Sequence, residues 1–267
     1  MLGIFDSGLG GLTITKEILS QLPKYQIIYF GDTARTPYGS RSPEVIYSFT
    51  QEAVDFLFKK GAELIIIACA TASSSALRRI QQEYLPKNYP QKRVLGVIRP
   101  LAEEAVKITK NKKIGVVGTR ATINSGAFIR EIKKLLPSAE VYQNSCPLLV
   151  PLIEEGWLKK PETKMLVRKC LAPLKMKQID TLILGCTHYP LLYKYFSRKS
   201  GRNCQVIPTG KVVACSLANY LERHPEIEKK IKKGDNHQFF VSDITPHFRE
   251  IASKWLERKI KLKLLKN

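Results

Sequence analysis

Short apolar runs alternate with amphipathic segments along the whole chain. The apolar runs predict buried strands at residues 2–6, 26–31, 63–69, 93–98, 113–119, 140–144, 180–186, 205–208 and 238–242. The segments between them have apolar positions at helical spacing, which predict helices at residues 13–22, 42–60, 72–84, 100–109, 122–136, 147–155, 161–176, 189–199, 211–221 and 246–258. Strands separated by helices in this way indicate an α/β protein with βαβ units and mainly parallel sheets.

The two halves of the chain resemble each other weakly. The stretch 3-GIFDSGLGGLTI-14 and the stretch 115-GVVGTRATINSG-126 each read as a strand, a turn that contains glycine, and a helix. This internal similarity predicts two pseudo-symmetric α/β domains, each with a sheet flanked by helices. We expect residues 1–95 plus 208–267 to form the first domain and residues 96–207 to form the second.

Polar residues follow three of the predicted strands. The first strand ends in Asp6 and Ser7, the third in 69-CAT-71, and a later one in 186-CTH-188. In parallel α/β sheets, ligands bind outside the carboxyl ends of the strands. Since Cys69 and Cys186 end strands in the two halves, we expect their thiols to face each other across one small substrate, in the cleft between the domains.

Cys69 and Cys186 each precede a predicted helix, whose dipole is expected to lower the thiol pKa from about 8.5 toward neutrality. Thr71 and Thr187 carry hydroxyls that can bind a carboxylate or cap the helix, and His188 can orient or protonate a neighbour. The remaining cysteines are interpreted as inert small hydrophobic residues, namely Cys146, Cys170, Cys204 and Cys215.

The glycine-rich turn 6-DSGLGG-11 does not match a nucleotide-binding motif. A dinucleotide fingerprint needs glycine where Thr13 stands, and no G-K-[ST] follows. The turn still exposes backbone N–H groups that suit a small anion, while Asp6 either acts in a site or caps the next helix. The stretch 32-DTARTPYGSRS-42 reads as a turn, and its composition alone does not separate a binding loop from an ordinary one.

The 267-residue chain carries a formal net charge of +21 that is spread unevenly. Residues 1–100 hold 12 Lys+Arg and 8 Asp+Glu, so +17 lies in residues 101–267, with basic clusters at 110–113, 228–233 and 258–266. Such an excess can attract nucleic acid, an anionic membrane surface or an acidic metabolite, and it also fits a solvated surface. No zinc-finger spacing or RNA-binding signature accompanies it.

The sequence shows neither a membrane span nor a signal peptide, and this bears on the cellular location. The apolar runs are shorter than the roughly 20 residues of a membrane span, and the N-terminus lacks the pattern of a signal peptide. The six cysteines are scattered, without a C-x-x-C pair or metal-like spacing to the histidines. We therefore expect reduced thiols in the cytoplasm, no disulfide framework and no metal site.

Six motifs, in order, resemble those of bacterial glutamate racemases, members of the cofactor-independent aspartate/glutamate racemase superfamily. They are DSGLGGLT, GDTARTPYGSRS, IACATAS, GVVGTRATINSG, CPLLVPLIEEG and LGCTHYPLL. The resemblance runs from residue 3 to about residue 255. It implies two α/β domains with the active site between them, and interconversion of L- and D-glutamate that supplies D-glutamate for peptidoglycan without a cofactor. Some members form homodimers, and a few bind DNA gyrase, which these motifs do not indicate.

The resemblance also assigns roles to individual residues. Cys69 and Cys186 match the two catalytic thiols, and Asp6, His188 and Glu154 match side chains that assist them. The positions that match substrate contacts are Asp6, Ser7, Tyr38, Gly39, Ala70, Thr71, Thr187 and His188. Two departures stand out. The family motif A-C-N-T reads 68-ACAT-71 here, so Ala70 replaces an amide, and the later Asp-Ser segment reads Pro208-Thr209.

Three other functions remain open on these residues. A relative in the superfamily can act on aspartate, a hydantoin or a malonate, although decarboxylases of this kind typically lack one of the two thiols. Ala70 is the reason to consider a weakly active racemase of broadened specificity, or a regulatory protein on a racemase scaffold. The positive charge is the reason to consider a partner of nucleic acid or of gyrase.

Overall fold

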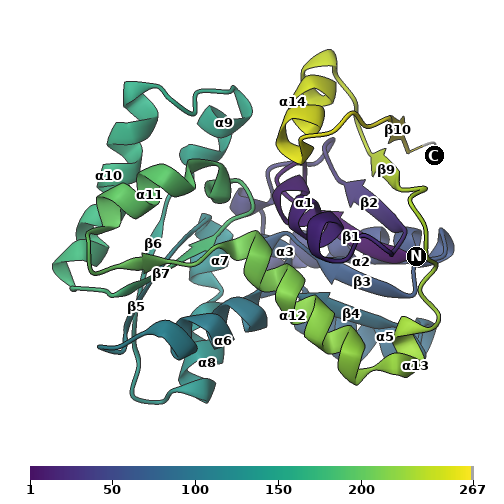
Figure 1. Cartoon of the computed structure of the whole chain (residues 1–267), viewed down its shortest axis with the longest axis horizontal. Coiled ribbons are helices and arrows are strands. Elements are labelled where there is room, and N and C mark those ends of the chain that lie inside the picture. The colour runs from purple at the N-terminus through teal and green to yellow at the C-terminus, as the bar shows by residue number, and fades with distance from the viewer. Residues whose placement is uncertain (266–267) are drawn as a thin grey trace.

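The computed structural model describes residues 1–265 and contains two parallel sheets (Figure 1). The first sheet has six strands in the order β10-β9-β2-β1-β3-β4, and the second has four in the order β6-β5-β7-β8. The strands are β1 (Leu2–Asp6), β2 (Ile27–Gly31), β3 (Leu64–Ile67), β4 (Arg93–Gly96), β5 (Lys113–Gly118), β6 (Glu140–Ser145), β7 (Thr181–Gly185), β8 (Gln205–Val206), β9 (Gln238–Val241) and β10 (Leu262–Leu264). All strand pairs are parallel, which confirms the predicted fold class of two α/β domains.

Helices connect the strands. The longer ones are α1 (Leu12–Gln21), α2 (Pro43–Lys59), α6 (Ile98–Ile108), α8 (Ala127–Leu135), α10 (Pro161–Met176), α11 (Tyr193–Ser200), α12 (Thr209–Arg223) and α14 (Pro246–Leu256). The shorter ones are α3 (Ala70–Ser75), α4 (Leu77–Arg79), α5 (Leu85–Asn88), α7 (Arg120–Asn124), α9 (Leu149–Glu154) and α13 (Pro225–Glu228). Three further turns are helical with other periods: η1 (Tyr38–Ser40), η2 (Ile80–Tyr84) and η3 (Tyr189–Leu192).

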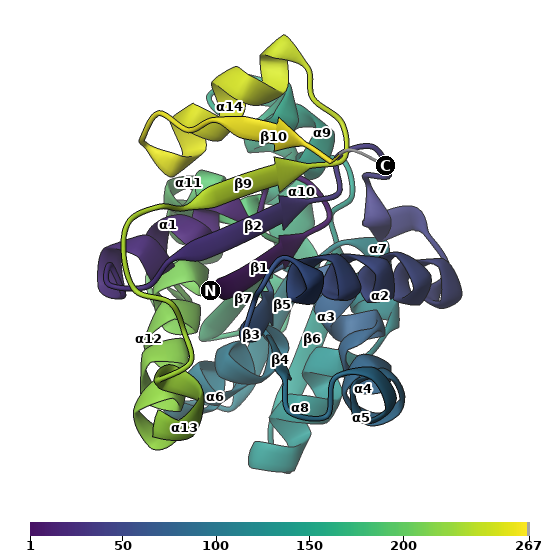
Figure 2. The same cartoon turned by 90° about the vertical axis from the view of Figure 1, so that its right-hand side faces the viewer.

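Each face of the first sheet is covered by helices, and the strand residues divide between the two faces. In β1, Ile4 packs in the core on the α1 side, whereas Phe5 packs in the core on the α2 side. Successive side chains of a strand point to opposite faces, so a strand buried on both faces is mostly apolar, as β1 is up to Asp6. Figure 2 shows the six strands stacked in the order given above, with the helices to either side. In the second domain, α10 contacts β5 and β6 while α6 contacts β7.

The predicted strands are confirmed with small differences at their ends, and β10 was missed. Three predicted helices are interrupted: residues 72–84 fold as α3, α4 and η2, residues 189–199 as η3 and α11, and residues 122–136 as parts of α7 and α8. The last break lies at Gly126, whose φ of +62° is a left-handed conformation that glycine adopts without strain. The short helices α5 and α13 were not predicted either.

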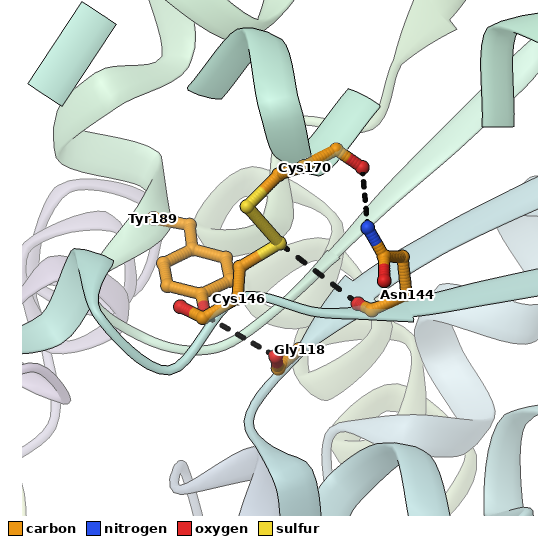
Figure 3. The surroundings of a disulfide bond; sticks show 5 residues. All are labelled: Gly118, Asn144, Cys146, Cys170 and Tyr189. Atoms are coloured by element: carbon orange, nitrogen blue, oxygen red, sulfur yellow. Dashed lines mark hydrogen bonds between the residues drawn. A yellow bond between two sulfur atoms is a disulfide. The ribbon is translucent and has the colours of Figure 1, made fainter. Parts of the chain in front are cut away.

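One pair of cysteines corrects the expectation of reduced, inert thiols. Cys146 follows β6, Cys170 lies in α10, and the two form a disulfide with their Cα atoms 5.9 Å apart (Figure 3). The Asn144 amide donates to the Cys170 carbonyl and the Tyr189 hydroxyl to the Cys146 carbonyl, both at 2.8 Å. The packing of α10 on β6 creates this proximity, which the sequence spacing alone does not reveal.

The remaining cysteines are free. Cys204 is buried, as an inert small hydrophobic residue would be, but Cys215 is exposed on α12, so its interpretation as a packed hydrophobic residue was wrong.

Among residues 1–265, no helix combines the length and the apolar character that crossing a membrane requires. In the same part of the chain, no group of three or more histidine, cysteine, aspartate or glutamate side chains is arranged to hold a metal ion.

Candidate active site

The strand ends of the two sheets meet around one small cavity of about 30 Å³. Cys69, after β3 of the first sheet, and Cys186, after β7 of the second, both line it. The other lining residues are Ser7, Thr36, Pro37, Tyr38, Gly39, Ala70, Thr71, Thr119, Val150, Thr187 and His188. The structure therefore brings together every residue assigned from the sequence to substrate contact except Asp6, which lies directly behind the cavity wall.

Cys69 is a buried thiol held at the beginning of α3. Its sulfur accepts a hydrogen bond from the Ala72 N–H at 3.4 Å and donates to the Ser7 hydroxyl at 3.3 Å. Burial, followed by the nearby Asp6 carboxylate, raises the thiol pKa to about 12 despite these hydrogen bonds. The predicted lowering by the helix dipole is wrong for Cys69, because α3 has only six residues and desolvation outweighs its field. At neutral pH Cys69 keeps its proton.

Cys186 has a different set of neighbours. Its sulfur lies 3.8 Å from His188 Nδ1, and His188 Nε2 donates to the Glu154 carboxylate at 3.0 Å. Burial lowers the pKa of His188, but the hydrogen bonds to Cys186 and Glu154 outweigh it and raise the pKa to about 10. The imidazole is therefore protonated at neutral pH and places a positive charge beside the Cys186 sulfur.

Asp6 is fully buried at the end of β1. Its carboxylate accepts from the Gly8 N–H at 3.1 Å and from the Thr187 hydroxyl at 3.3 Å, so it joins the two domains behind the sulfurs. Burial raises the pKa of Asp6, although the charge of His188 and the hydrogen bonds work against this rise. The glycine-rich turn thus holds a carboxylate of the chain itself.

Gly10 and Gly39 allow the two domains to approach each other closely. A Cβ atom on Gly10 would lie 2.4 Å from the Thr187 hydroxyl and 2.6 Å from His188 Nδ1. A Cβ atom on Gly39 would lie 2.7 Å from the Cβ of Thr119. Since atoms this close would have to move apart, both positions need glycine for contact across the cleft.

Tyr38 is buried beside the cavity and its hydroxyl donates to Asp32. Asp32 also accepts from Arg35 Nε and from the Ser242 hydroxyl, both at 2.7 Å. Burial and the Asp32 charge raise the pKa of Tyr38, so the phenol stays neutral. The loop 32–42 is therefore held by a carboxylate network and presents Tyr38 and Gly39 to the site.

Three buried threonine hydroxyls form a cluster that the sequence reading missed. Thr71 Oγ1 lies 2.8 Å from Thr119 Oγ1 and 3.2 Å from Thr122 Oγ1, and the last two are 3.0 Å apart. Thr71 comes from the first domain and the other two from the second. The repeat identified in the sequence contains the signal for Thr119, because aligning Gly3 with Gly115 aligns Ser7 with Thr119.

A larger cavity of about 510 Å³ lies elsewhere, lined by Arg78, Arg99, Arg130 and Arg223 among others. None of the residues at the strand ends of β1, β3 and β7 lies in its wall. We assign the site to the smaller cavity because the acid–base groups converge there. A volume of about 30 Å³ is far below the roughly 300–1,000 Å³ of typical small-molecule pockets, so an amino acid requires the walls to move apart.

The cavity has one sulfur on each side, which determines the chemistry that the site can perform. A protonated thiol faces the cavity from one domain, and a sulfur beside a cationic imidazole faces it from the other. A carbon atom between them can lose a proton to one sulfur and receive a proton from the other. Backbone N–H groups and threonine hydroxyls around the cavity suit a carboxylate.

Comparison with known proteins agrees with this geometry. The family model described as Asp/Glu/Hydantoin racemase matches residues 2–216. A protein of Geobacter metallireducens named glutamate racemase is 40% identical over 259 residues, which cover 97% of this chain and 93% of the relative.

Solved structures agree as well. The glutamate racemase isoform of Bacillus anthracis superposes with a TM-score of 0.91 at 36% identity, over 100% of this chain and 97% of that one. The enzyme of Francisella tularensis, solved in complex with D-glutamate, gives a TM-score of 0.88 at 34% identity, over 99% and 97% of the two chains. On its sequence and its fold, the chain belongs to the Asp/Glu/Hydantoin racemase family.

Proposed function

We propose that the chain is a glutamate racemase that interconverts L- and D-glutamate by moving the α-proton between two sulfurs. The observation that supports this most is that Cys69 and Cys186, each at the end of a parallel strand in a different sheet, line the same cavity. Relatives at about 40% identity over nearly the full length carry the name glutamate racemase, which favours catalysis over a purely regulatory role.

In the proposed reaction, each sulfur serves one face of the substrate. For one enantiomer, the Cys186 sulfur takes the proton from Cα, and the Cys69 thiol gives its own proton to the opposite face. The site then holds a thiolate at Cys69 and a thiol at Cys186, which is the arrangement needed for the other enantiomer. Two fixed groups therefore allow both directions from a single bound pose.

Three further side chains assist the sulfurs in this proposal. His188, held by Glu154, supplies positive charge beside Cys186, and Asp6 supplies negative charge on the side of Cys69. The Asp6 charge favours the proton on Cys69, while His188 places a positive charge beside the sulfur that takes the proton in the proposed step. The mechanism uses only groups that belong to the chain.

Substrate binding is assigned to the polar cavity wall. Ser7, Tyr38, Gly39, Thr71 and Thr187 line the cavity, as does Ala70. We add Thr119, which lines the cavity at the position that corresponds to Ser7 in the internal repeat. Hydroxyl and backbone N–H donors would hold the two carboxylates of glutamate and stabilise the negative charge that develops at Cα.

The proposal extends to the setting of the reaction. We infer that residues 1–95 plus 208–267 form one domain and residues 96–207 the other, which is supported by the strands that each sheet contains.

We further propose a cytoplasmic enzyme that supplies D-glutamate for peptidoglycan. Sedimentation of the purified protein tests whether it forms a homodimer. Binding to duplex DNA or to gyrase at increasing salt tests the alternative suggested by its charge.

The decisive test offers L-glutamate, L-aspartate and several neutral amino acids to the purified protein in deuterated water. We expect the optical signal of L-glutamate to decay to zero while deuterium enters Cα, as NMR detects. Loss of signal for aspartate but not glutamate would reassign the substrate. Glutamate binding without inversion or exchange would contradict the proposed activity.

A further inference from the structure

The His188–Glu154 pair is partly exposed on its Glu154 side. His188 is almost fully buried, with 6% of its side chain exposed, whereas the Glu154 side chain is 29% exposed. Glu154 is the last residue of α9, and helix ends leave their final carbonyl groups without partners inside the helix. A carboxylate at such an end needs a second anchor if it is to hold a fixed position against His188.

That anchor comes from the other domain. His247, in the first turn of α14, has Nε2 2.9 Å from the carbonyl oxygen of Glu154 and donates a hydrogen bond to it. Helix α14 follows β9 of the first sheet, while α9 belongs to the second domain; Figure 1 shows the two helices facing each other across the top of the molecule. Nε2 can carry its proton in both the neutral and the charged imidazole, so this bond does not require a charged His247.

The same helix also contacts the other member of the pair. The ring of Trp255, the next-to-last residue of α14, meets the ring of His188 edge-on with their centroids 5.6 Å apart. Trp255 is buried, at 6% exposure. One helix of the first domain therefore touches both His188 and Glu154, at two points that are eight residues apart along the chain.

The beginning of α14 is connected to the loop 32–42, which carries Tyr38 and Gly39. Thr245 caps the helix by accepting from the Phe248 N–H at 3.1 Å, and Pro246 occupies its first position. Just before it, the Ser242 hydroxyl donates to Asp32, the carboxylate that also holds Tyr38. His247 is thus presented from a rigid element that connects the loop 32–42 to the helix end at Glu154.

We propose that His247 is a positioning residue of the active site, which holds the end of α9 so that the Glu154 carboxylate stays against His188, and His188 against the Cys186 sulfur. The expected effect on the reaction rate rests on the proposed function. The expected effect on the pKa of His188 does not, because it can be measured without turnover. Three contacts connect the surface of one domain to the sulfur of the other: His247 to Glu154 at 2.9 Å, Glu154 to His188 at 3.0 Å, and His188 to Cys186 at 3.8 Å.

A test that does not need turnover is an NMR titration of His188 in the full chain labelled with ¹⁵N-histidine. The chain has four histidines, so each signal can be assigned by substitution. The titratable groups that face His188 are Cys186 after β7, Glu154 on α9 and Asp6 after β1, and α14 adds the uncharged Trp255. Of the three groups, only Glu154 is contacted by His247.

In His247→Ala we expect the titration midpoint of His188 to fall by roughly one pH unit, because a displaced Glu154 no longer favours the imidazolium. His247→Gln keeps an N–H donor of similar reach and should restore most of the midpoint. His224→Ala is the matched control: His247 is exposed and contacts a glutamate, and His224 is partly exposed and also contacts a glutamate, Glu226, but follows the end of α12. It should leave the midpoint unchanged.

Kinetics then connect the effect to catalysis. We expect His247→Ala to lower kcat for glutamate about five- to tenfold, with a smaller change in KM and an alkaline limb that moves to lower pH, and His247→Gln to recover the rate. An unchanged His188 midpoint in both variants would overturn the inference, even if the rate fell. A shifted midpoint in a protein that does not racemise glutamate would support the inference and reject the proposed function instead. If His247→Ala does not fold, His247→Leu, which also lacks a donor but fills more of the space, takes its place, and its midpoint is compared with that of the parent chain in the same way.

Discussion

Cys69 and Cys186 occupy equivalent places in the two domains but have different surroundings. Each follows a buried parallel strand and begins a turn into a helix. Around Cys69, the nearest polar groups are the Ser7 hydroxyl and the Ala72 N–H, with the Asp6 carboxylate nearby. Around Cys186, they are His188 and, beyond it, Glu154. The backbone is similar, whereas the charges have opposite signs.

In the proposed mechanism, this difference gives the two sulfurs different starting roles. Burial and the negative charge of Asp6 keep Cys69 protonated, and the imidazolium of His188 lies against Cys186. On this proposal, the asymmetry makes Cys69 the sulfur that donates its proton first. The following predictions test this comparison.

The largest effect is expected from removing either sulfur. Cys69→Ser and Cys186→Ser should each lower racemisation of glutamate by about 10³-fold or more, since one of the two acid–base groups is lost. Optical rotation or circular dichroism of the substrate measures this directly. Cys215→Ser, which changes an exposed cysteine, should retain the parental rate. A Cys69→Ser protein with parental racemisation would remove Cys69 from the mechanism.

The second effect concerns the charge beside Cys186. His188→Asn should lower kcat about 10- to 100-fold and remove the alkaline limb that we expect for the parent near pH 10. Stability should change in parallel. Because the folded pKa of His188 lies above its ordinary value of 6.5, its protonation stabilises the fold fully below about pH 6.5, and this contribution is lost as the pH rises through 10.

Urea unfolding at a series of pH values measures that contribution. The difference in unfolding free energy between the parent chain and His188→Asn should shrink steadily between pH 6.5 and 10. The difference between two chains is used because lysines and the Cys69 thiol also titrate in alkaline solution. A difference that stays constant over this range would show that His188 is not protonated in the folded chain.

A smaller effect is expected from replacing Asp6, with a gain in stability and a loss of activity. Burial raises the pKa of this carboxylate, so its charged form opposes folding as the pH rises above its ordinary range. Asp6→Asn removes the charge and keeps one of the two oxygens, so it retains the hydrogen bond from either Gly8 or Thr187. We expect Tm to rise by roughly 2–4 °C and kcat to fall about tenfold. A variant that loses both stability and activity would indicate that the ionised carboxylate supports the fold.

The smallest effect is expected at Ala70, which lines the cavity where the family motif has asparagine. Ala70→Asn adds a side-chain hydrogen bond at the cavity wall and should raise kcat/KM for glutamate by about two- to tenfold. The same change should lower activity on smaller or neutral amino acids. Kinetics on both classes of substrate that do not differ from the parent would show that another group compensates for the missing amide.

Much of this site was predictable from the sequence because the pattern of buried strands determines where their ends lie. Residues 64–67 and 181–185 are buried throughout and apolar except for Thr181, so the cysteines that follow them reach the carboxyl edges of two sheets. The motif resemblance then added Glu154 and Tyr38, which no local pattern singles out. Strand β10 was missed because Leu262–Leu264 is short, interrupted by lysine and mostly exposed.

The features that the sequence did not predict depend on contacts between distant segments. The disulfide of Cys146 and Cys170 requires α10 to pack on β6. The direction of the pKa shift of Cys69 depends on how completely its surroundings exclude water, which a helix-dipole argument from the sequence does not contain. His247 reaches Glu154 only because the C-terminal helix returns to the cleft, 93 residues further along the chain.

The most direct measurement follows hydrogen exchange at Cα in deuterated water, with each enantiomer of glutamate offered separately to the two single-sulfur variants. With one sulfur left, only the enantiomer whose α-proton points toward it can exchange. We predict that Cys69→Ser incorporates deuterium into one enantiomer and Cys186→Ser into the other, with little inversion in either case. Exchange of both enantiomers at equal rates by either variant would contradict the account, because a single sulfur would then reach both faces of the substrate.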